Sequence, residues 1–328
     1  SPSPHIHADN SVNKLMRGVL FALLPALLVS FCYFGIGAVI VCAVSVASCV
    51  FFEWAISKWL LHNDGKSVLD LSAVLTGVLL AFNLPSNLPV WIIIIGAFVA
   101  IGVGKMTFGG LGCNLFNPAL VGRCFLLVSF PAQMTSWPVP GQLLKYTDAT
   151  TGATPLSLMK WAIKSNDPSV LEKLPDEMTM LLGNTSLGYG AGALGEVCAL
   201  ALLLGLAYML WKRIITWHIP VSIIATVLVF SGVLHLCSPS YENPIGVLLS
   251  GGLLLGAIFM ATDYVTTPIT SKGKVVFALG CGVITFIIRY FCSYPEGVSF
   301  SILIMNILTP FIEKLTANKP LGGSKNGK

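Results

Sequence analysis

Long apolar segments separated by short polar stretches make up most of this sequence. A helix that crosses the hydrocarbon core of a membrane needs roughly 20 apolar residues. Ten segments approach that length, at residues 17–36, 37–60, 68–85, 88–105, 116–132, 189–211, 215–236, 245–262, 274–293 and 299–316. We therefore expect an all-α polytopic membrane protein with about ten transmembrane helices, in which residues 1–328 form a single membrane domain.

Two of these spans are short and interrupted. The third ends in the sequence FNLP at residues 82–85, and the fifth begins with Asn117 and Pro118. Broken helices of this kind line binding sites in transporters. A weak repeat is also visible, because TGVLL at 76–80 resembles IGVLL at 245–249, five spans later. The repeat favours a five-plus-five inverted arrangement with broken helices, although segments of Gly, Val and Leu also resemble one another by chance.

Composition and charge support the membrane interpretation and give it an orientation. The chain is 55% hydrophobic and 10% charged, with a mean hydropathy of +0.82, whereas soluble domains carry about 25% charged residues. With the N-terminus in the cytoplasm, 14 of the 19 Lys and Arg residues lie inside. This bias places both termini in the cytoplasm. The net charge of +5 then marks cytoplasmic loops, so we expect a lipid environment and no nucleic-acid partner.

The one long polar stretch, residues 132–188, is predicted to face the outside and to form short helices against the membrane. It contains the sequence DATTGAT at 148–154, followed by Pro155. Taken alone, these residues form an ordinary turn, since Gly and Pro both favour turns. The sequence nevertheless resembles the D-x-x-[S/T]-G-A-T signature of covalent flavin attachment. The positions that match the signature are Asp148, Thr151, Gly152, Ala153 and Thr154.

A second segment points to a family. The sequence FGGLGCNLFNPAL at 108–120 resembles the F-G-G-x-G-x-N-x-x-N-P-A-L motif of the RnfD/NqrB family, and further landmarks stand at 3–7, 129–134 and 192–196. Members of this family are the flavin-bearing membrane subunits of the Rnf complex and of the sodium-pumping NADH:quinone reductase. The chain is closer to the RnfD branch, because its N-terminal extension is short.

The resemblance implies two flavins. A flavin transferase would join FMN to Thr154 through a phosphoester, on a hydroxyl in an exposed and flexible loop. A non-covalent riboflavin would lie within the membrane, where Asn114 and Asn117 match asparagines that contact it. A carboxamide offers both a donor and an acceptor to the edge of the flavin ring. Alternatively the asparagines cap the fifth span, since Asn before Pro is a good helix start; the two roles are compatible.

Several ionisable residues lie in or near the spans, and such residues are functional candidates because charge is expensive in a membrane. They are Glu53, Asp70, Arg123, Glu196, His235, Asp263 and Arg289. Glu196 is the first candidate for ion or proton coupling and Asp263 the second. Asp70, Asp263 and Arg289 also lie near predicted span ends, where they can reach water. Glu53 can share a helical face with Lys58. The nine cysteines form no CxxC pair, so we expect packing residues and no metal site.

The resemblance implies an electron-transfer subunit of a ferredoxin:NAD oxidoreductase that translocates Na⁺ or H⁺ across the bacterial cytoplasmic membrane. Such a chain is part of an enzyme and is not catalytically complete alone. Its partners would include a second subunit with covalent FMN and iron–sulfur membrane subunits. Three alternatives stay open: a subunit of the related quinone reductase, a small-solute channel or secondary transporter, and a structural anchor for redox partners.

Overall fold

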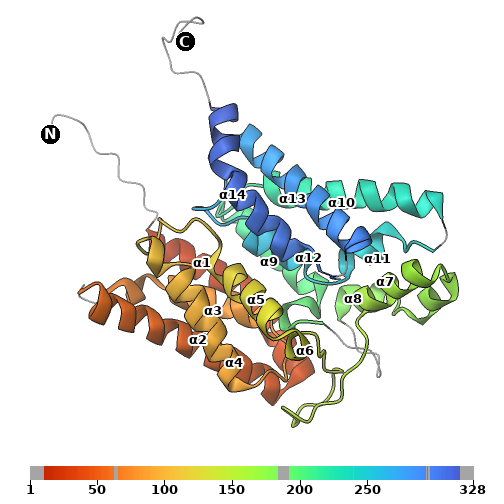
Figure 1. Cartoon of the computed structure of the whole chain (residues 1–328), viewed down its shortest axis with the longest axis horizontal. Helices are drawn as coiled ribbons and strands as arrows, with labels where there is room; N and C mark the ends of the chain where they lie inside the picture. Colours follow the sequence, from red (N-terminus) through yellow and green to blue (C-terminus); the bar gives the residue numbers. More distant parts are fainter. Residues whose placement is uncertain are drawn as a thin grey trace, which may run out of the picture.

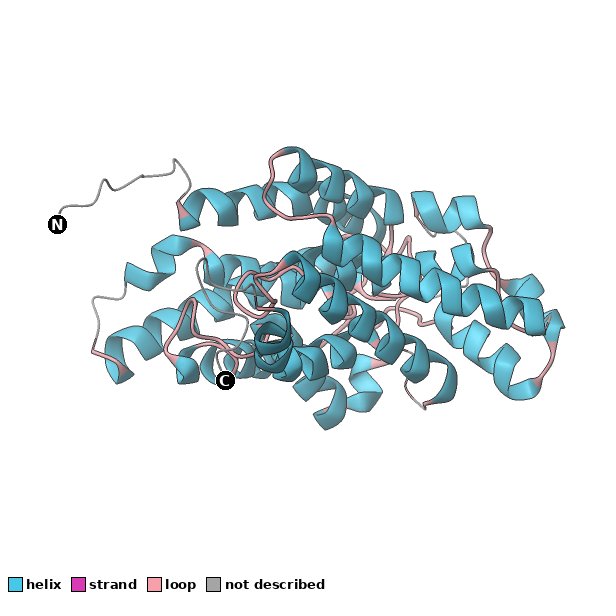
Figure 2. Ribbon diagram, turned by 90° about the horizontal axis from the view of Figure 1, so that it is seen from above, coloured by secondary structure: helices cyan, strands magenta, loops and turns pink. Residues whose placement is uncertain are grey.

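The computed structural model describes residues 11–62, 66–183, 192–238, 240–292, 294 and 296–317, and every element within these ranges is a helix. The β pairing in this part of the chain is limited to an isolated bridge between Pro138 and Thr151. Figure 2 shows helices joined by loops, with no strand among the coloured residues. The prediction of an all-α fold is therefore confirmed.

The N-terminal group of helices follows the first five predicted spans. Its main helices are α1 (Val12–Phe34), α2 (Ile36–Ala55), α3 (Ser72–Phe82), α4 (Val90–Phe98) and α5 (Pro118–Ser129). The π-helical turns η1 (Ile56–Leu60) and η3 (Val99–Val103) extend α2 and α4, and two 3₁₀ turns lie at η2 (Lys66–Asp70) and η4 (Met106–Phe108). Helix α2 packs against α3 and α4, and α5 packs against α3 and η3. Figure 1 shows this group in red to yellow.

A segment of short helices follows α5, as the polar stretch predicted. Its elements are α6 (Pro131–Met134), α7 (Pro155–Ser165), η5 (Pro168–Lys173) and α8 (Glu177–Leu182). Helix α7 packs against η5, and α8 packs against α9 and α11 of the second group. The end of the predicted loop, residues 184–188, lies outside the described residues.

The C-terminal group contains one interrupted span. Its elements are η6 (Leu194–Glu196), α9 (Ala199–Trp211), α10 (His218–Cys237), α11 (Pro244–Leu249), α12 (Leu253–Leu255), η7 (Gly256–Met260), α13 (Ser271–Phe291) and α14 (Val298–Thr316). Helix α13 packs between α10 and α14. The span that begins with α11 breaks at residues 250–252, and its second half is buried from Leu253 to Ala261.

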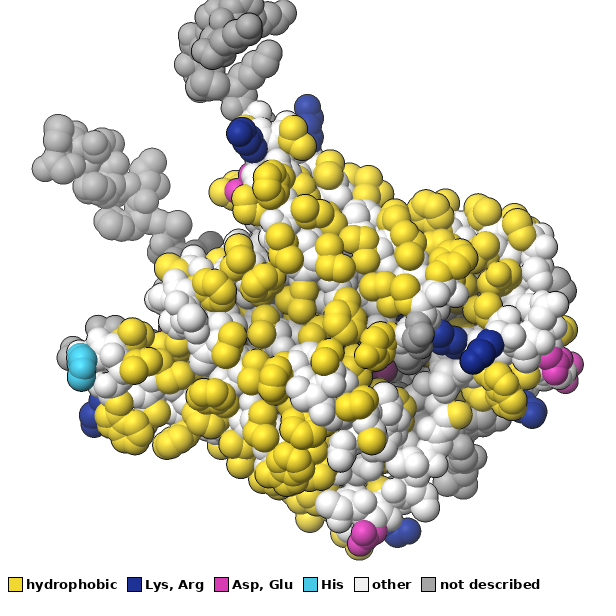
Figure 3. All heavy atoms as spheres, in the orientation of Figure 1, with side chains coloured by type: hydrophobic (Ala, Val, Ile, Leu, Met, Phe, Trp, Pro, Cys, Tyr) yellow, Lys and Arg dark blue, Asp and Glu magenta, His cyan; other side chains and the backbone are white. Residues whose placement is uncertain are grey.

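Each predicted span contains helical residues, but the helices differ in length, and ten membrane crossings stay a prediction. Six of them are long and apolar enough to cross a membrane: Val12–Phe34, Ile36–Leu60, Val90–Phe108, His218–Cys237, Ser271–Phe291 and Val298–Thr316. Three are shorter apolar helices of 11–13 residues: α3, α5 and α9. Hydrophobic side chains cover most of the face drawn in Figure 3, over both groups of helices. The chain is therefore a multi-pass membrane protein.

The two groups meet along their first and last helices. Helix α1 packs against α9, and α5 packs against α14, while η7 contacts both α10 and α14. One continuous hydrophobic core includes residues of both groups. Several of the polar residues predicted to be functional lie along this junction.

Candidate functional site

The loop before Thr154 is held by backbone hydrogen bonds. Val139 N donates to Thr150 O at 3.0 Å, and Gly152 N donates to Trp137 O at 3.0 Å. The side chain of Gln142 also clamps Thr150, because it donates to the carbonyl and accepts from the N–H, both at 2.8 Å. These bonds fix the path of the motif and bring Trp137 next to its glycine.

Thr154 is the N-cap of α7. Its backbone is extended, Pro155 occupies the first helical turn, and Thr154 Oγ1 accepts a hydrogen bond from Ser157 N at 3.2 Å. This is the usual chemistry of a helix start. The expectation of an exposed hydroxyl is wrong, since Thr154 is 8% exposed whereas Asp148 and Thr151 are exposed. The cap uses the oxygen as an acceptor, and the same side chain lines a cavity.

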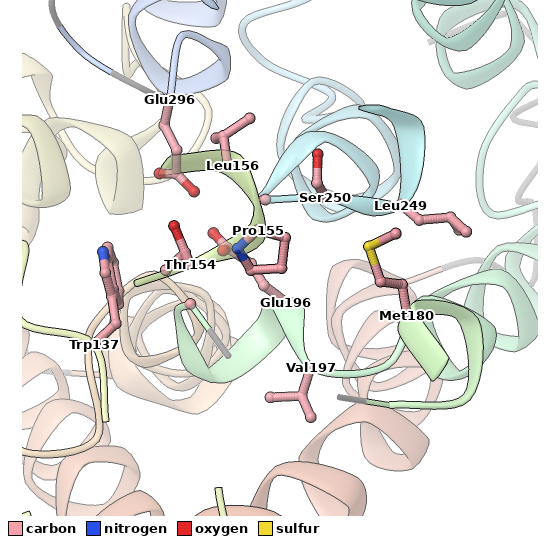
Figure 4. Close-up of a pocket in the computed structure, with 12 residues that line it drawn as sticks. Trp137, Thr154, Pro155, Leu156, Met180, Glu196, Val197, Leu249, Ser250 and Glu296 are labelled. Carbon is pink, nitrogen blue, oxygen red and sulfur yellow. The ribbon is translucent and has the colours of Figure 1, made fainter. Parts of the chain in front are cut away.

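Two adjoining cavities meet at Thr154, and we call them together the outer cavity. Thr154, Trp137 and Glu296 line both of them. Gly152 and Ala153 line the larger one. Figure 4 shows the Thr154 hydroxyl between the indole of Trp137 and the carboxylates of Glu196 and Glu296.

Arg123 forms a buried ion pair at this cavity. The residue is 4% exposed, and its guanidinium pairs with Glu296. Its Nη1 donates to Asn83 Oδ1 at 2.8 Å and to Ser299 Oγ at 2.6 Å. The side chain therefore connects α5 to the end of α3 and to the start of α14, across the junction of the two groups.

Arg289 is buried instead of reaching water, so that expectation is wrong. It is 4% exposed, and its guanidinium donates to Val247 O at 2.9 Å and to Ser250 O at 3.1 Å. These carbonyls belong to the end of α11, whose last carbonyls have no partner within the helix. Arg289 thus stabilises the end of the broken span.

The break itself depends on two glycines. Gly251 has a φ of +66°, which side chains other than glycine rarely adopt. Gly252 N donates to Glu296 Oε1 at 3.2 Å. A Cβ on Gly252 would lie 3.0 Å from Glu196 Oε1, and one on Gly251 would lie 3.2 Å from Arg289 Nη2. The charged residues therefore approach the backbone closely at this point.

Glu196 faces the same break from η6. Its Oε2 accepts a hydrogen bond from Ala193 N at 3.3 Å. Its Oε1 is buried and has no hydrogen-bond partner among the described residues. The sequence pattern pointed to Glu196 and Arg123 but not to Glu296, which lies in a connection between spans where a carboxylate attracts no notice.

A second cavity, which we call the inner cavity, is lined by Asn114, Asn117, Asp263 and Lys105 together with apolar residues. Asn117 caps α5, because its Oδ1 accepts from Ala119 N at 3.1 Å, and its Nδ2 donates to Met260 O at 3.1 Å. The predicted capping role of Asn117 is confirmed. Asn114 does not cap the helix.

Asn114 instead connects two parts of the inner cavity. Its Nδ2 donates to Phe116 O at 3.0 Å and lies 3.5 Å from Asp263 Oδ2, which also accepts from Thr266 at 3.3 Å. The structure therefore brings Asn114, Asn117 and Asp263 together, although they come from opposite halves of the chain. Asp263 is partly buried at this cavity.

Lys105 is a further residue that the sequence pattern did not single out. It is one of the 14 basic residues placed on the cytoplasmic side. It is nevertheless buried, and its Nζ donates to Glu53 Oε2 at 2.6 Å and to Ser72 Oγ at 2.5 Å. Lys58 instead lies over the ring of Trp54, 5.1 Å from its centroid. The partner of Glu53 is therefore not the lysine five residues away. The position of Lys105, directly after an apolar run, was the available signal.

Helix α5 joins the two cavities. Asn117 at its start faces the inner cavity and Arg123 faces the outer one. Six residues separate them, which corresponds to about 9 Å along a helix. Asn83 bridges the gap, because its Oδ1 accepts from Arg123 and its Nδ2 lies 3.6 Å from the sulfur of Met260.

Comparison with known proteins gives matches over almost the whole chain. Residues 1–322 match the family described as NQR2, RnfD, RnfE. The D-type subunit of the Na⁺-translocating ferredoxin:NAD⁺ oxidoreductase complex of Acetobacterium woodii is 45% identical, over 99% of this chain and 95% of its own. Its counterpart in the proton-translocating complex of Clostridium ljungdahlii is 40% identical, over 96% and 93%. The counterpart in the ion-translocating oxidoreductase complex of Actinobacillus succinogenes is 35% identical, over 99% and 98%.

Proposed function

Because the chain belongs to the NQR2, RnfD, RnfE family, we propose that it is the flavin-bearing RnfD subunit of an ion-translocating ferredoxin:NAD oxidoreductase. The observation that carries the proposal is the position of Thr154, whose hydroxyl faces the outer cavity at the end of a complete attachment signature. The chain works as part of an enzyme complex, and the sites for ferredoxin and NAD belong to partner subunits.

The outer cavity fits a covalent FMN. Gly152 and Ala153 leave room beside the hydroxyl, and Trp137 offers an aromatic face to a flavin ring. Arg123 supplies a positive charge in the wall of the same cavity, toward the FMN phosphate. When bound, the flavin supplies one- and two-electron chemistry, and the chain's residues hold it in place.

The inner cavity fits a non-covalent riboflavin. Its wall is mostly apolar, as a planar aromatic ring requires, and it presents the amides of Asn114 and Asn117. The Asn117 carboxamide already bonds to the backbone on both sides, so its orientation is fixed before a ligand arrives. With about 9 Å of α5 between the cavities, the two flavins would form consecutive steps of one electron path.

We also propose the ten-span, five-plus-five inverted repeat. The first helices of the two groups, α1 and α9, pack together, and so do the last, α5 and α14. Both pairings agree with a pseudo-two-fold axis between the groups, as in transporters built from inverted repeats. The resulting orientation puts both termini in the bacterial cytoplasm and the Thr154 loop outside.

The partners and the coupling residues follow from this proposal. The chain would contact a second subunit with covalent FMN and iron–sulfur membrane subunits, after a flavin transferase has modified Thr154. Glu196 and Asp263 are the proposed coupling residues. Relatives of similar identity are named for Na⁺ in one case and for protons in the other, so overall similarity does not indicate the ion.

The test is flavin fluorescence on a denaturing gel. Chain made in cells with the flavin transferase should give a fluorescent band, Thr154→Val should remove the fluorescence, and Thr151→Ser should keep it. A wild-type band without fluorescence would contradict the proposal and favour a channel or secondary transporter. Fluorescence retained in Thr154→Val but lost in Thr151→Val would move the attachment to Thr151.

A further inference from the structure

Four buried or half-buried charged residues converge on the helix break beside Thr154. Arg123 comes from α5, Glu196 from η6, Arg289 from α13, and Glu296 from the segment before α14. A Cβ on Gly252 would touch or approach three of them, since Glu196 Oε1, Glu296 Oε1 and Arg123 Nη1 lie at 3.0, 3.6 and 3.8 Å. Two positive and two negative charges leave this cluster neutral.

A flavin on Thr154 disturbs that balance. Its phosphodiester carries one negative charge, and each electron that arrives adds another. In a site of low dielectric constant, uncompensated charge is strongly unfavourable. The charge added by the electron is compensated if a group in the wall takes up a proton, and the surroundings of each carboxylate decide which one.

Glu196 is the carboxylate that can bind a proton without losing a hydrogen bond. Glu296 already pairs with Arg123 through Oε2 and accepts from Gly252 N through Oε1. Glu196 accepts one hydrogen bond on Oε2, while its buried Oε1 has no partner among the described residues and the residue lines the cavity at Thr154. A proton on Oε1 therefore breaks no existing hydrogen bond and removes a charge that repels the flavin.

We propose that Glu196 takes up one proton when the first electron reaches the flavin on Thr154 and releases it when the flavin is reoxidised. The electron comes from the electron donor of the complex, and the proton comes from water in the outer cavity. One O–H bond forms at Glu196 Oε1 on reduction and breaks on reoxidation. This inference rests on the proposed function, because it requires the covalent flavin.

The other groups around Glu196 do not take up the proton in its place. Arg123 and Arg289 stay positively charged, and Glu296 stays paired. Helix α1 packs against η6 through Ser30, whose hydroxyl donates to Leu194 O at 2.5 Å. Leu84, which follows α3, accepts through its carbonyl from Leu194 N at 3.2 Å. Neither of these groups titrates near neutral pH.

Infrared difference spectra of the assembled complex, recorded while the covalent flavin is reduced, test the inference. Wild type should show a carboxylic C=O band that appears on reduction and shifts in D₂O, and Glu196→Gln should lose it. The midpoint potential of Glu196→Gln should depend less on pH, by up to about 59 mV per tenfold change in proton concentration. Glu172→Gln, an exposed acid in the same outer segment, should leave both unchanged.

Two results would overturn the inference. One is a carboxylic band that persists in Glu196→Gln with an unaltered potential. The other is a Glu196-dependent effect of Na⁺ on the potential without any carboxylic band, since a cation would then compensate the charge. Gel fluorescence is measured first in wild type and in each variant, so the spectra compare only protein that carries the flavin, and a wild type without flavin counts against the proposed function instead. Glu196→Asp keeps a carboxylate at this position and should keep the band, which shows whether an acidic side chain there suffices for proton uptake.

Discussion

Replacement of Arg123 by glutamine should destabilise the protein strongly. The side chain is 4% exposed, pairs with Glu296 and donates to Asn83 and Ser299, so the change leaves a carboxylate and two polar groups without their cation. Breaking a buried ion pair by removing one partner costs about 3–5 kcal/mol. Glutamine retains one donor, so we expect a loss near the lower end, about 3 kcal/mol.

Thermal unfolding in lipid nanodiscs, followed by the fluorescence of the seven tryptophans, measures this effect. A destabilisation of about 3 kcal/mol corresponds to a fall in Tm on the order of 10 °C. Lys58→Gln is the control, because this exposed lysine lies over the ring of Trp54, where cation–π contacts contribute about 0.5–1 kcal/mol.

A double-mutant cycle separates the ion pair from the rest of the site. Glu296→Gln alone should also destabilise the protein, but the double variant should be more stable than the sum of the two by about 2 kcal/mol. This recovery is expected because the double variant leaves no unpaired charge. Additive effects, or a Tm of Arg123→Gln within about 2 °C of wild type, would refute the assignment of a stabilising buried pair.

The remaining predictions concern the helix break and the inner cavity. Gly251→Ala should lower Tm more than Gly141→Ala. Both glycines have a positive φ, but only at Gly251 would the new Cβ crowd neighbouring side chains. Equal losses would mean that backbone strain alone acts. Asn117→Asp keeps the cap of α5 and should fold, but it loses the donor to Met260 O. The purified variant should therefore contain less riboflavin, measured by acid extraction. Undiminished riboflavin would remove Asn117 from that site.

The hydrophobic pattern predicted the positions of the helices, because local chemistry sets the limits of the apolar segments. The third span ends at Phe82 and the fifth begins at Pro118, as the FNLP and Asn-Pro sequences indicated. The break at 250–252 was not anticipated, although Ser-Gly-Gly interrupts the apolar run there. Two glycines within a membrane span are common, and only the charges around them show that this pair ends a helix.

The candidate site was predictable only as far as it is local in sequence. Thr154 and Asn117 belong to short motifs, so their roles could be proposed from neighbouring residues. Arg123 and Glu296 lie far apart in the chain, and which carboxylate meets the guanidinium depends on how α5 and α14 pack. For the same reason Glu53 pairs with Lys105 and not with the nearer Lys58.

The site also bears on which cation compensates the flavin charge. A hard metal cation needs several oxygen ligands at once. Near Glu196, several oxygens already have partners. Ser250 O accepts from Arg289, the Ser250 hydroxyl donates to Val247 O at 3.0 Å, and the Glu296 carboxylate binds Arg123 and Gly252 N. A proton needs a single oxygen, and Glu196 Oε1 offers one. The arrangement at the outer cavity therefore favours a proton over Na⁺ at this position, whichever ion the complex moves elsewhere.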